Sequence, residues 1–327
     1  VLMEKPLSAS EKECADLLAA QKKHGGKVMV CHVLRYAKGF TRAAELIDEG
    51  AIGKLVSIQA LEQVGYWHQA HSYVRGNWRR SEETTPMILA KCCHDLDLLQ
   101  WYAKSKCVSV SSTGDLAFFN RAHKPEGAAD RCLQCKYIDS CPYSAKRIYI
   151  DNWKSAGKPD NIWPQNVITL QNPLTEEAMR EALQNGPYGR CVFACDNNVV
   201  DHQIVQMQFE NGVNASLTMM AFTANGGRII RFFGTKGEIV LNEEEDTIYV
   251  KPFGEKPETI RIAAIAIVEG GHSHGGGDFG LITALYDVLT GEQPANTSLE
   301  ASVESHLMGI AAEKSRLNGG VCVQVHE

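Results

Sequence analysis

The chain has 327 residues, of which 44 % are hydrophobic and 22 % are charged, fractions that exclude a disordered or collagen-like chain. A formal net charge of −6 argues against a general nucleic-acid-binding protein, because that function needs a basic surface. No apolar stretch approaches the ~18 residues of a membrane span, the first residues do not form a signal peptide, and the cysteine count is odd, at eleven. We therefore expect a cytoplasmic protein with neither nucleic-acid nor membrane partners.

The first 33 residues predict a strand end, a helix and a second strand, which is the order of an α/β layer. The segment at 8–11 (SASE) fits a helix capping box, and residues 11–23 are rich in helix formers. Gly25-Gly26 end this helix before an apolar, strand-like run at 27–33.

The rest of the chain predicts a larger α+β domain. Between 199 and 262, β-rich runs alternate with turn signals such as Glu210-Asn211-Gly212, which predict a meander of antiparallel strands. Residues 117–172 are rich in proline, glycine, asparagine and cysteine and predict an irregular insertion. The other predicted elements are helices at about 39–49, 86–104, 174–185 (capped by Thr175), 279–290 and 298–317, and strands at 54–62 and 321–326.

Five motifs occur in order along the chain: Glu4-Lys5-Pro6, the stretch 46–55 (LIDEGAIGKL), the stretch 94–99 (HDLDLL), the stretch 233–238 (FGTKGE) and the stretch 311–315 (AAEKS). Together they resemble the Gfo/Idh/MocA oxidoreductases, which include glucose–fructose oxidoreductase and inositol dehydrogenase. The resemblance implies hydride transfer between NAD or NADP and a sugar or sugar-like secondary alcohol. The alternatives are a non-catalytic sugar-binding or assembly module and a relative that cleaves glycosides while recycling NAD.

The resemblance also implies a domain organisation. The family begins with a dinucleotide-binding half that carries a Gly-x-Gly-x-x-Gly turn, and we expect that half to lie before Glu4, where the printed sequence has only three residues. Residues 1–35 would then be the C-terminal remnant of a Rossmann-type domain, and 36–327 a substrate and oligomerisation domain with an insertion at about 117–172. The expected fold is α/β followed by α+β, with an open, mainly antiparallel sheet covered by helices on one face. The open face would pair subunits in a homo-dimer or tetramer.

The family resemblance implies that Lys5 lies beside the nicotinamide and the substrate, and that His94 is the base that takes the hydroxyl proton. The aspartate that the family places four residues before this histidine is replaced by Ala90. On one helix, Lys91 and His94 would share a face, so we hypothesise that Lys91 polarises the substrate or orients the base. The alternative is that Lys91 is an ordinary helix residue and His94 a buried, hydrogen-bonded histidine.

Binding residues are expected in several segments. The stretch 66–79 (YWHQAHSYVRGNWR) combines aromatic rings with polar groups, which suits a carbohydrate; a polar loop pinned by its aromatic residues is the alternative. From this stretch we predict His71, Arg75 and Trp78 as substrate residues. The family resemblance adds Tyr36, and the start of a sheet strand adds Asp201 and His202. The predicted cofactor-binding residues are Glu4, Lys5, Pro6 and Arg35.

The irregular insertion contains three cysteines within a span of ten residues: Cys132, Cys135 and Cys141. Their spacing fits a structural zinc or an iron–sulfur site, with unliganded thiols as the alternative. We predict Cys191 as a fourth ligand, with Cys195 and His123 as other candidates. A bound metal would fasten a loop of this length.

Overall fold

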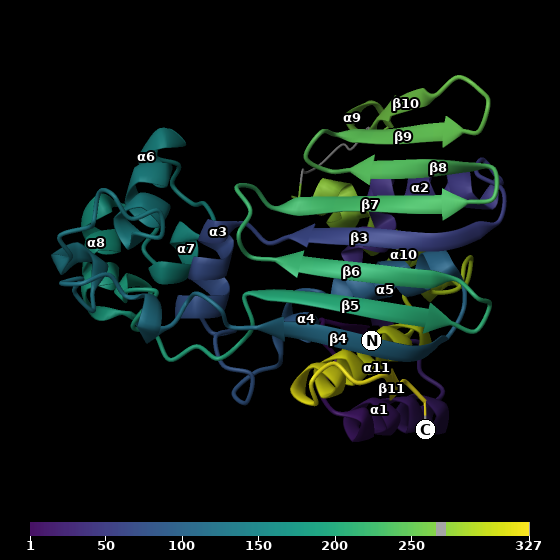
Figure 1. The fold of residues 1–327 in the computed structure, drawn as a ribbon, viewed down its shortest axis with the longest axis horizontal. Coiled ribbons are helices and arrows are strands. Elements are labelled where there is room, and N and C mark those ends of the chain that lie inside the picture. Colours follow the sequence, from purple (N-terminus) through teal and green to yellow (C-terminus); the bar gives the residue numbers. More distant parts are fainter. Residues whose placement is uncertain (266–272, 327) are drawn as a thin grey trace.

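The structure, a computed structural model, describes residues 1–265 and 273–326. Within these residues, nine strands form one large sheet in the order β10-β9-β8-β7-β3-β6-β5-β4-β11 (Figure 1). The strands are β3 (Leu55–Gln63), β4 (Cys107–Asp115), β5 (His202–Phe209), β6 (Asn214–Met220), β7 (Gly227–Gly234), β8 (Gly237–Asn242), β9 (Thr247–Pro252), β10 (Glu258–Arg261) and β11 (Val323–Gln324).

Helices cover one face of this sheet and leave the other face open, as predicted (Figure 1). Along β5, buried side chains alternate with exposed ones such as Ile204, because successive side chains of a strand point to opposite faces. The helices α2 (Lys38–Asp48), α5 (Cys93–Ala103) and α11 (Leu299–Leu317) pack against this sheet. Helix α10 (Gly277–Thr290) lies against the segment 33–36 and contributes to the same core. Pairing of subunits through the open face remains a prediction.

The sheet is mixed, which corrects the prediction of a mainly antiparallel meander. The early strand β3 lies between β6 and β7, parallel to β6 with Ile58 opposite Ala215, and antiparallel to β7 with Ile58 opposite Phe232. Pairings between segments so distant in sequence leave no local signal, whereas the predicted hairpin does: β5 and β6 pair around a turn in which Gly212 adopts a φ of 85°.

The N-terminal segment has the predicted order of elements. Two short parallel strands, β1 (Leu2–Met3) and β2 (Met29–Val30), flank the helix α1 (Glu11–His24). The Ser10 side chain accepts a hydrogen bond from the Glu13 amide, and Gly25 ends the helix with a φ of 67°. That residues 1–35 are the remnant of a Rossmann-type domain remains a prediction.

A helical lobe extends from one end of the sheet (Figure 1). It has its own hydrophobic core, built around Tyr149, Met179 and Phe193, so it extends beyond the predicted insertion at 117–172. Thr175 caps α8, as predicted. Its elements are α3 (Tyr66–His68), the π-helical segment η2 (Gln69–Arg75), the short turns η3 (Arg121–His123), η4 (Cys132–Gln134) and η6 (Pro187–Gly189), the π-helical segment η5 (Lys146–Asp151), α6 (Asn152–Ser155), α7 (Gln165–Ile168) and α8 (Glu176–Asn185).

The helix predicted at 86–104 is interrupted. A short helix, α4 (Met87–Ala90), ends before Lys91, and α5 begins at Cys93. The remaining short elements are η1 (Val33–Tyr36), α9 (Ile262–Ile265) and η7 (Ser273–Gly276).

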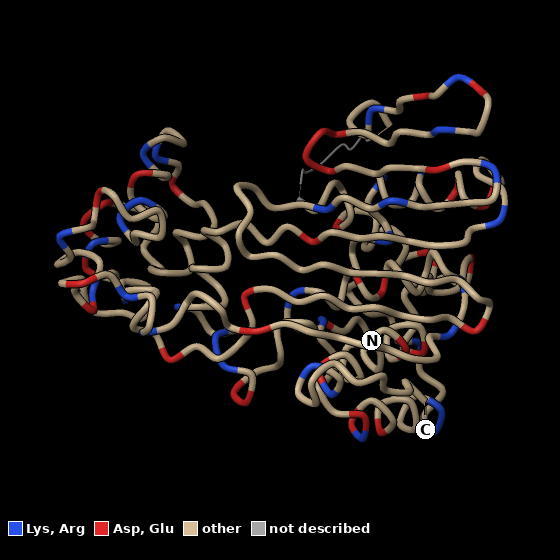
Figure 2. Tube along the Cα trace, in the orientation of Figure 1, with Lys and Arg blue, Asp and Glu red and all other residues tan. Residues whose placement is uncertain are grey.

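Charged residues of both signs are interspersed over the lobe and the sheet edges, whereas β5 and β6 carry neither sign (Figure 2). None of the helices in the described part of the chain has the length and apolar character that crossing a membrane requires.

Candidate active site

The segment Glu4-Lys5-Pro6 follows β1 directly, and the residue after it is hydrogen-bonded to a buried histidine. The Leu7 amide donates to Nε2 of His306 at 2.9 Å, and Nδ1 of His306 donates to the Ser302 carbonyl at 2.6 Å. Burial lowers the pKa of His306 to about 4, so the ring is neutral at pH 7. A neutral ring is what this arrangement needs, since one nitrogen must accept while the other donates.

An open cavity of about 640 Å³ borders this segment. Its wall includes Glu4, Lys5 and Pro6 on one side and Trp78 and Thr85 on another. The structure thus brings the predicted substrate residue Trp78 to the same cavity as the Glu-Lys-Pro motif.

His94 lies in the first turn of α5, and its environment keeps the ring neutral. Its Nδ1 is enclosed and has no hydrogen-bond partner among the described residues. Burial, reinforced by the positive charges of Lys5 and Lys91, lowers the pKa of His94 well below its usual value. The ring also packs edge-on against His32, with centroids 5.6 Å apart. Lys5 and Lys91 therefore lie close enough to His94 to influence its protonation; their catalytic roles remain a prediction.

Lys91 is not an ordinary surface lysine. Its Nζ lies 3.0 Å from Oε1 of Glu62, whose side chain is fully buried. Arg228 contacts the same carboxylate at 3.0 Å and donates to Asp95 at 2.7 Å. Burial raises the pKa of Glu62 to about 7, against the opposing effect of both cations. Lys91 thus projects from the break between α4 and α5 and is fixed by a carboxylate from β3.

The side chains of Arg35 and Tyr36 are bound to other residues of the protein. Arg35 is 4 % exposed and makes a bidentate ion pair with Asp97, with two nitrogen–oxygen distances of 2.7 Å. It also donates to the Asn296 carbonyl and to Gln100, and its guanidinium lies 5.6 Å from the centroid of the Trp101 ring. The Tyr36 hydroxyl lies 3.1 Å from the Thr297 hydroxyl. The guanidinium predicted to bind the cofactor is therefore engaged by α5.

The lobe encloses two of the predicted substrate residues. His71 is 3 % exposed, stacks on Tyr188 and pairs with the Tyr149 hydroxyl at 2.8 Å; burial lowers its pKa to about 4. Arg75 is fully buried beside the cysteines. These contacts match the alternative interpretation, a polar segment pinned by its aromatic residues.

Asp201 and His202 lie where β5 begins. Asp201 is fully buried; it accepts from the Phe118 amide at 2.7 Å and pairs with Nδ1 of His202 at 2.8 Å. Asp201 therefore ties the first residues of the lobe to the sheet.

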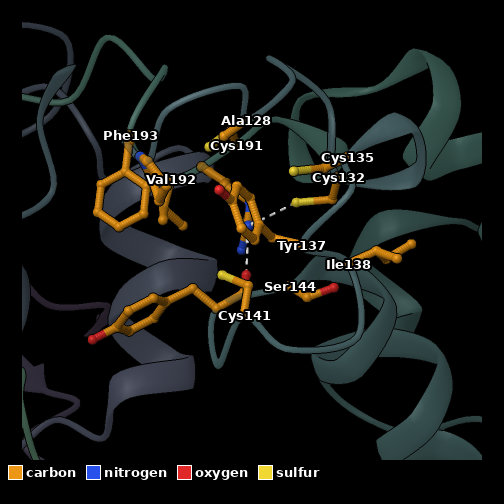
Figure 3. Close-up of a pocket in the computed structure, with 13 residues that line it drawn as sticks. Ala128, Cys132, Cys135, Tyr137, Ile138, Cys141, Ser144, Cys191, Val192 and Phe193 are labelled. Atoms are coloured by element: carbon orange, nitrogen blue, oxygen red, sulfur yellow. Dashed lines mark hydrogen bonds between the residues drawn. The ribbon is translucent and has the colours of Figure 1, made fainter. Parts of the chain in front are cut away.

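The four cysteines predicted as metal ligands border one cavity of the lobe. Cys132, Cys135, Cys141 and Cys191 line this cavity (Figure 3). The Cys195 thiol donates to the Cys191 carbonyl. Within the described ranges, however, no group of three or more histidine, cysteine or acidic side chains is arranged to hold a metal ion. The prediction of a structural zinc is therefore not supported.

Sequence reasoning missed several residues that shape the site. Glu62 and Arg228 come from two strands, and their role depends on tertiary pairing. The pKa of His68 is lowered well below its usual value by burial and by the nearby Lys91. The sequence placed His68 in the aromatic stretch but gave no reason to select it over His71.

The comparison with protein families supplies the deciding observation. Residues 44–325 match the family model described as "Oxidoreductase family, C-terminal alpha/beta domain" (GFO_IDH_MocA_C). The chain belongs to the Gfo/Idh/MocA oxidoreductase family.

Individual relatives agree with this assignment. The putative oxidoreductase YteT of Bacillus subtilis is 25 % identical to this chain over 324 residues, which cover 91 % of this chain and 71 % of YteT. The 2,7-anhydro-N-acetylneuraminate hydratase of Escherichia coli is 30 % identical over 170 residues, which cover 52 % of this chain and 42 % of the hydratase.

Solved structures share the fold. An oxidoreductase domain protein from Kribbella flavida matches with a TM-score of 0.66 at 16 % identity, over all of this chain and 74 % of its own. An oxidoreductase from Agrobacterium radiobacter, crystallised with NAD+, L-tartaric acid and magnesium, matches with a TM-score of 0.64 at 13 % identity, over 99 % of this chain and 72 % of its own.

The buried histidines of this Gfo/Idh/MocA protein predict sensitivity to acid. His71 and His306 have pKa values of about 4, below the ~6.5 of an unfolded histidine. Between these values the unfolded state binds more protons, so stability falls as the pH falls, by about 1.4 kcal/mol per pH unit for each histidine. We expect urea midpoints to decline steeply from pH 6.5 to 4. His306→Gln should flatten this decline, and His24→Gln, at an exposed position of α1, should not.

Proposed function

We propose that this chain supplies the substrate-binding half of an NAD(P)-dependent oxidoreductase that acts on a sugar or sugar-like secondary alcohol. The observation that carries the proposal is that the positive charges of Lys5 and Lys91 act on a neutral His94, while Lys5 also borders the open cavity at the Glu-Lys-Pro segment. Oxidation of a hydroxyl group needs a base for the proton and positive charge for the developing alkoxide, and these residues offer both.

His94 is the proposed base. Since burial and nearby cations lower its pKa well below the usual value, the ring is neutral near pH 7 and can accept a proton. Its Nδ1 is enclosed while the residue as a whole is partly exposed, so the other ring nitrogen, Nε2, is the proposed proton acceptor. In the reverse direction the protonated ring would return the proton to the substrate oxygen.

Lys5 and Lys91 are the proposed electrostatic partners. An ammonium group near the reacting oxygen stabilises the alkoxide more than the neutral hydroxyl, which lowers the barrier. Glu62 acts on Lys91 rather than on the substrate, because its carboxylate is fully buried and 3.0 Å from Nζ. We therefore assign Glu62 as a positioning residue.

The residues present fit the nicotinamide end of the cofactor. Glu4, Lys5 and Pro6 border an open cavity and, in the proposed complex, would border the nicotinamide. When bound, the cofactor accepts or returns the hydride. The guanidinium of Arg35 is engaged by Asp97, so we do not assign it a direct cofactor contact.

A second candidate function is hydration or elimination on a sugar ring, with the cofactor recycled within each turnover. It is favoured by the two matching proteins named as 2,7-anhydro-N-acetylneuraminate hydratases, from Mediterraneibacter gnavus and Escherichia coli. The same base and cations would serve this reaction.

Two measurements on the protein expressed from its complete reading frame test the proposal. First, titration with NADH and NADPH, followed by nicotinamide fluorescence, should saturate. Second, a panel of sugars, inositols and anhydrosugars with NAD+ or NADP+ should reveal turnover. Net formation of reduced cofactor indicates the dehydrogenase, whereas product without net reduction indicates the recycling reaction.

Lys91→Met should lower kcat by about 10- to 100-fold with little change in KM, because the ammonium is needed mainly for the alkoxide. Lys23→Met, in the exposed last turn of α1, is the matched control. Sugar binding without any NAD(P)H binding or turnover would overturn the enzyme proposal and favour a sugar-binding module.

A further inference from the structure

A histidine with no role in the proposed function is buried beside the proposed base, His94. His32 lies between β2 and η1, and its side chain is fully buried. Its amide donates to the Val30 carbonyl at 2.8 Å, and its carbonyl accepts from the Arg35 amide at 3.2 Å. The main chain on both sides therefore fixes the point from which the ring projects.

Neither ring nitrogen of His32 has a hydrogen-bond partner among the described residues. A neutral imidazole carries one donor and one acceptor, and burying either of them without a partner is unfavourable. Because most buried polar groups in proteins are hydrogen-bonded, a ring with two unpaired nitrogens calls for an explanation. Both nitrogens of this ring are free to exchange a proton with a neighbouring group.

Two imidazole rings of the described residues contact that of His32, and they differ in what they can offer. The ring of His306 lies 5.8 Å away between centroids, but main-chain groups already engage both of its nitrogens. The ring of His94 lies edge-on at 5.6 Å, and its enclosed Nδ1 has no partner among the described residues. Hydrogen bonds of an active site are often long in the free protein and shorten when substrate binds. His94 is therefore the neighbour with which His32 can pair.

The charges around His32 suit a ring that is neutral at rest and can hold a proton briefly. Burial lowers the pKa of His32; the carboxylate of Asp97 opposes this effect, and the positive charges of Arg35 and Lys5 add to it. Nδ1 of His32 lies 3.9 Å from Oδ2 of Asp97, and both side chains are 1 % exposed. The carboxylate can therefore stabilise a positive charge on this ring.

We propose that His32 relays the substrate proton through His94, an inference that rests on the proposed function. Nε2 of His94 takes the hydroxyl proton, and Nδ1 of His94 gives its own proton to Nε2 of His32, which keeps a proton on Nδ1 towards Asp97. The C–H bond of the alcohol breaks in the same oxidation, and its hydride goes to the nicotinamide that the proposed function already supplies. After the product leaves, the proton returns to solvent through His94, the partly exposed member of the pair.

The positions of the ring protons test the relay without a measurement of activity. Both rings must carry their proton on Nδ1 at pH 7, because the relay runs from Nδ1 of His94 to Nε2 of His32. Nitrogen-15 NMR of the histidine-labelled protein, expressed from its complete reading frame, distinguishes the two tautomers, and His94→Gln and His32→Gln assign the signals. A proton on Nε2 of either ring would overturn the relay even if the protein oxidises sugars. Absence of NAD(P)H binding and turnover would overturn the proposed function, and the relay with it.

Kinetics of His32→Gln provide the second test. Glutamine can accept a hydrogen bond from His94 but cannot take its proton, so kcat should fall by about 10- to 100-fold. KM should stay within about twofold, because His32 does not touch the substrate. The rate in mixtures of H2O and D2O should follow a curve in the wild type, where two protons move together, and a straight line in the variant. A merely structural histidine would not change the shape of this dependence.

Two further variants keep the test decisive. His24→Gln, at the exposed end of α1, is the control and should behave as the wild type. His32→Phe removes every polar atom from the buried position and should show the same loss if glutamine prevents folding. A kcat within threefold of wild type in either folded variant would contradict the relay. So would a straight-line dependence on D2O content in the wild type, a measurement that requires no variant.

Discussion

Replacing His94 by glutamine is expected to lower kcat/KM by about 10²- to 10⁴-fold, the usual contribution of a general base. Glutamine keeps a polar group at the first turn of α5 but cannot take the substrate proton. Affinity for NADH or NADPH should not change, because the loss concerns proton transfer. Steady-state kinetics on the alcohol identified by the panel, combined with the fluorescence titration, measure both quantities.

The pH profile distinguishes a base from a residue that only shapes the site. Because the pKa of His94 is lowered well below its usual value, the wild-type protein should keep its activity below pH 6.5, where an exposed histidine would already be protonated. The acidic limb that follows should be absent from His94→Gln. His24→Gln, at the exposed end of α1, is the control. A His94→Gln rate within threefold of wild type would remove His94 from the mechanism.

Local chemistry made much of the fold predictable. The cap residues Ser10 and Thr175 act within three residues of their partners, so the sequence alone identifies both helix starts. The hairpin turn ending at Gly212 is equally local. Each of these signals depends on neighbours along the chain.

Tertiary contacts explain why the uninterrupted helix at 86–104 and the mainly antiparallel sheet were wrong predictions. The break between α4 and α5 contains no glycine or proline; it coincides with Lys91, which is tied to Glu62 on β3. The insertion of β3 between β6 and β7 depends on partners more than 150 residues away and has no local signature. For the same reason, the residues that hold the site could not be identified before the strands were paired.

The stretch 94–99 contains one residue that could be selected from the sequence and two whose roles depend on tertiary contacts. The family resemblance selected His94, and the structure gives the neighbouring carboxylates a physical role. Asp95 pairs with Arg228, and Asp97 pairs with Arg35. Two buried ion pairs thus fix the first turns of α5 and hence the orientation of His94. The motif combines one candidate reacting group with two scaffold groups.

Asp97→Asn should therefore destabilise the protein by about 3–5 kcal/mol, because it leaves Arg35 charged and buried without its carboxylate. Arg35 is 4 % exposed, and Asp97 is 1 % exposed, so water cannot replace the lost partner. Urea unfolding at pH 7.5 measures the effect as a lower midpoint at an unchanged slope.

The exposed pair formed by Lys12 and Asp16 provides the matched control. Their side chains are 83 % and 62 % exposed, so Asp16→Asn should leave the urea midpoint nearly unchanged. The double variant Arg35→Met, Asp97→Leu should recover much of the loss, since apolar side chains carry no buried charge. If Asp97→Asn instead costs no more than Asp16→Asn, Arg35 is not held by this ion pair, and its guanidinium would be available for the cofactor contact that the family resemblance implies.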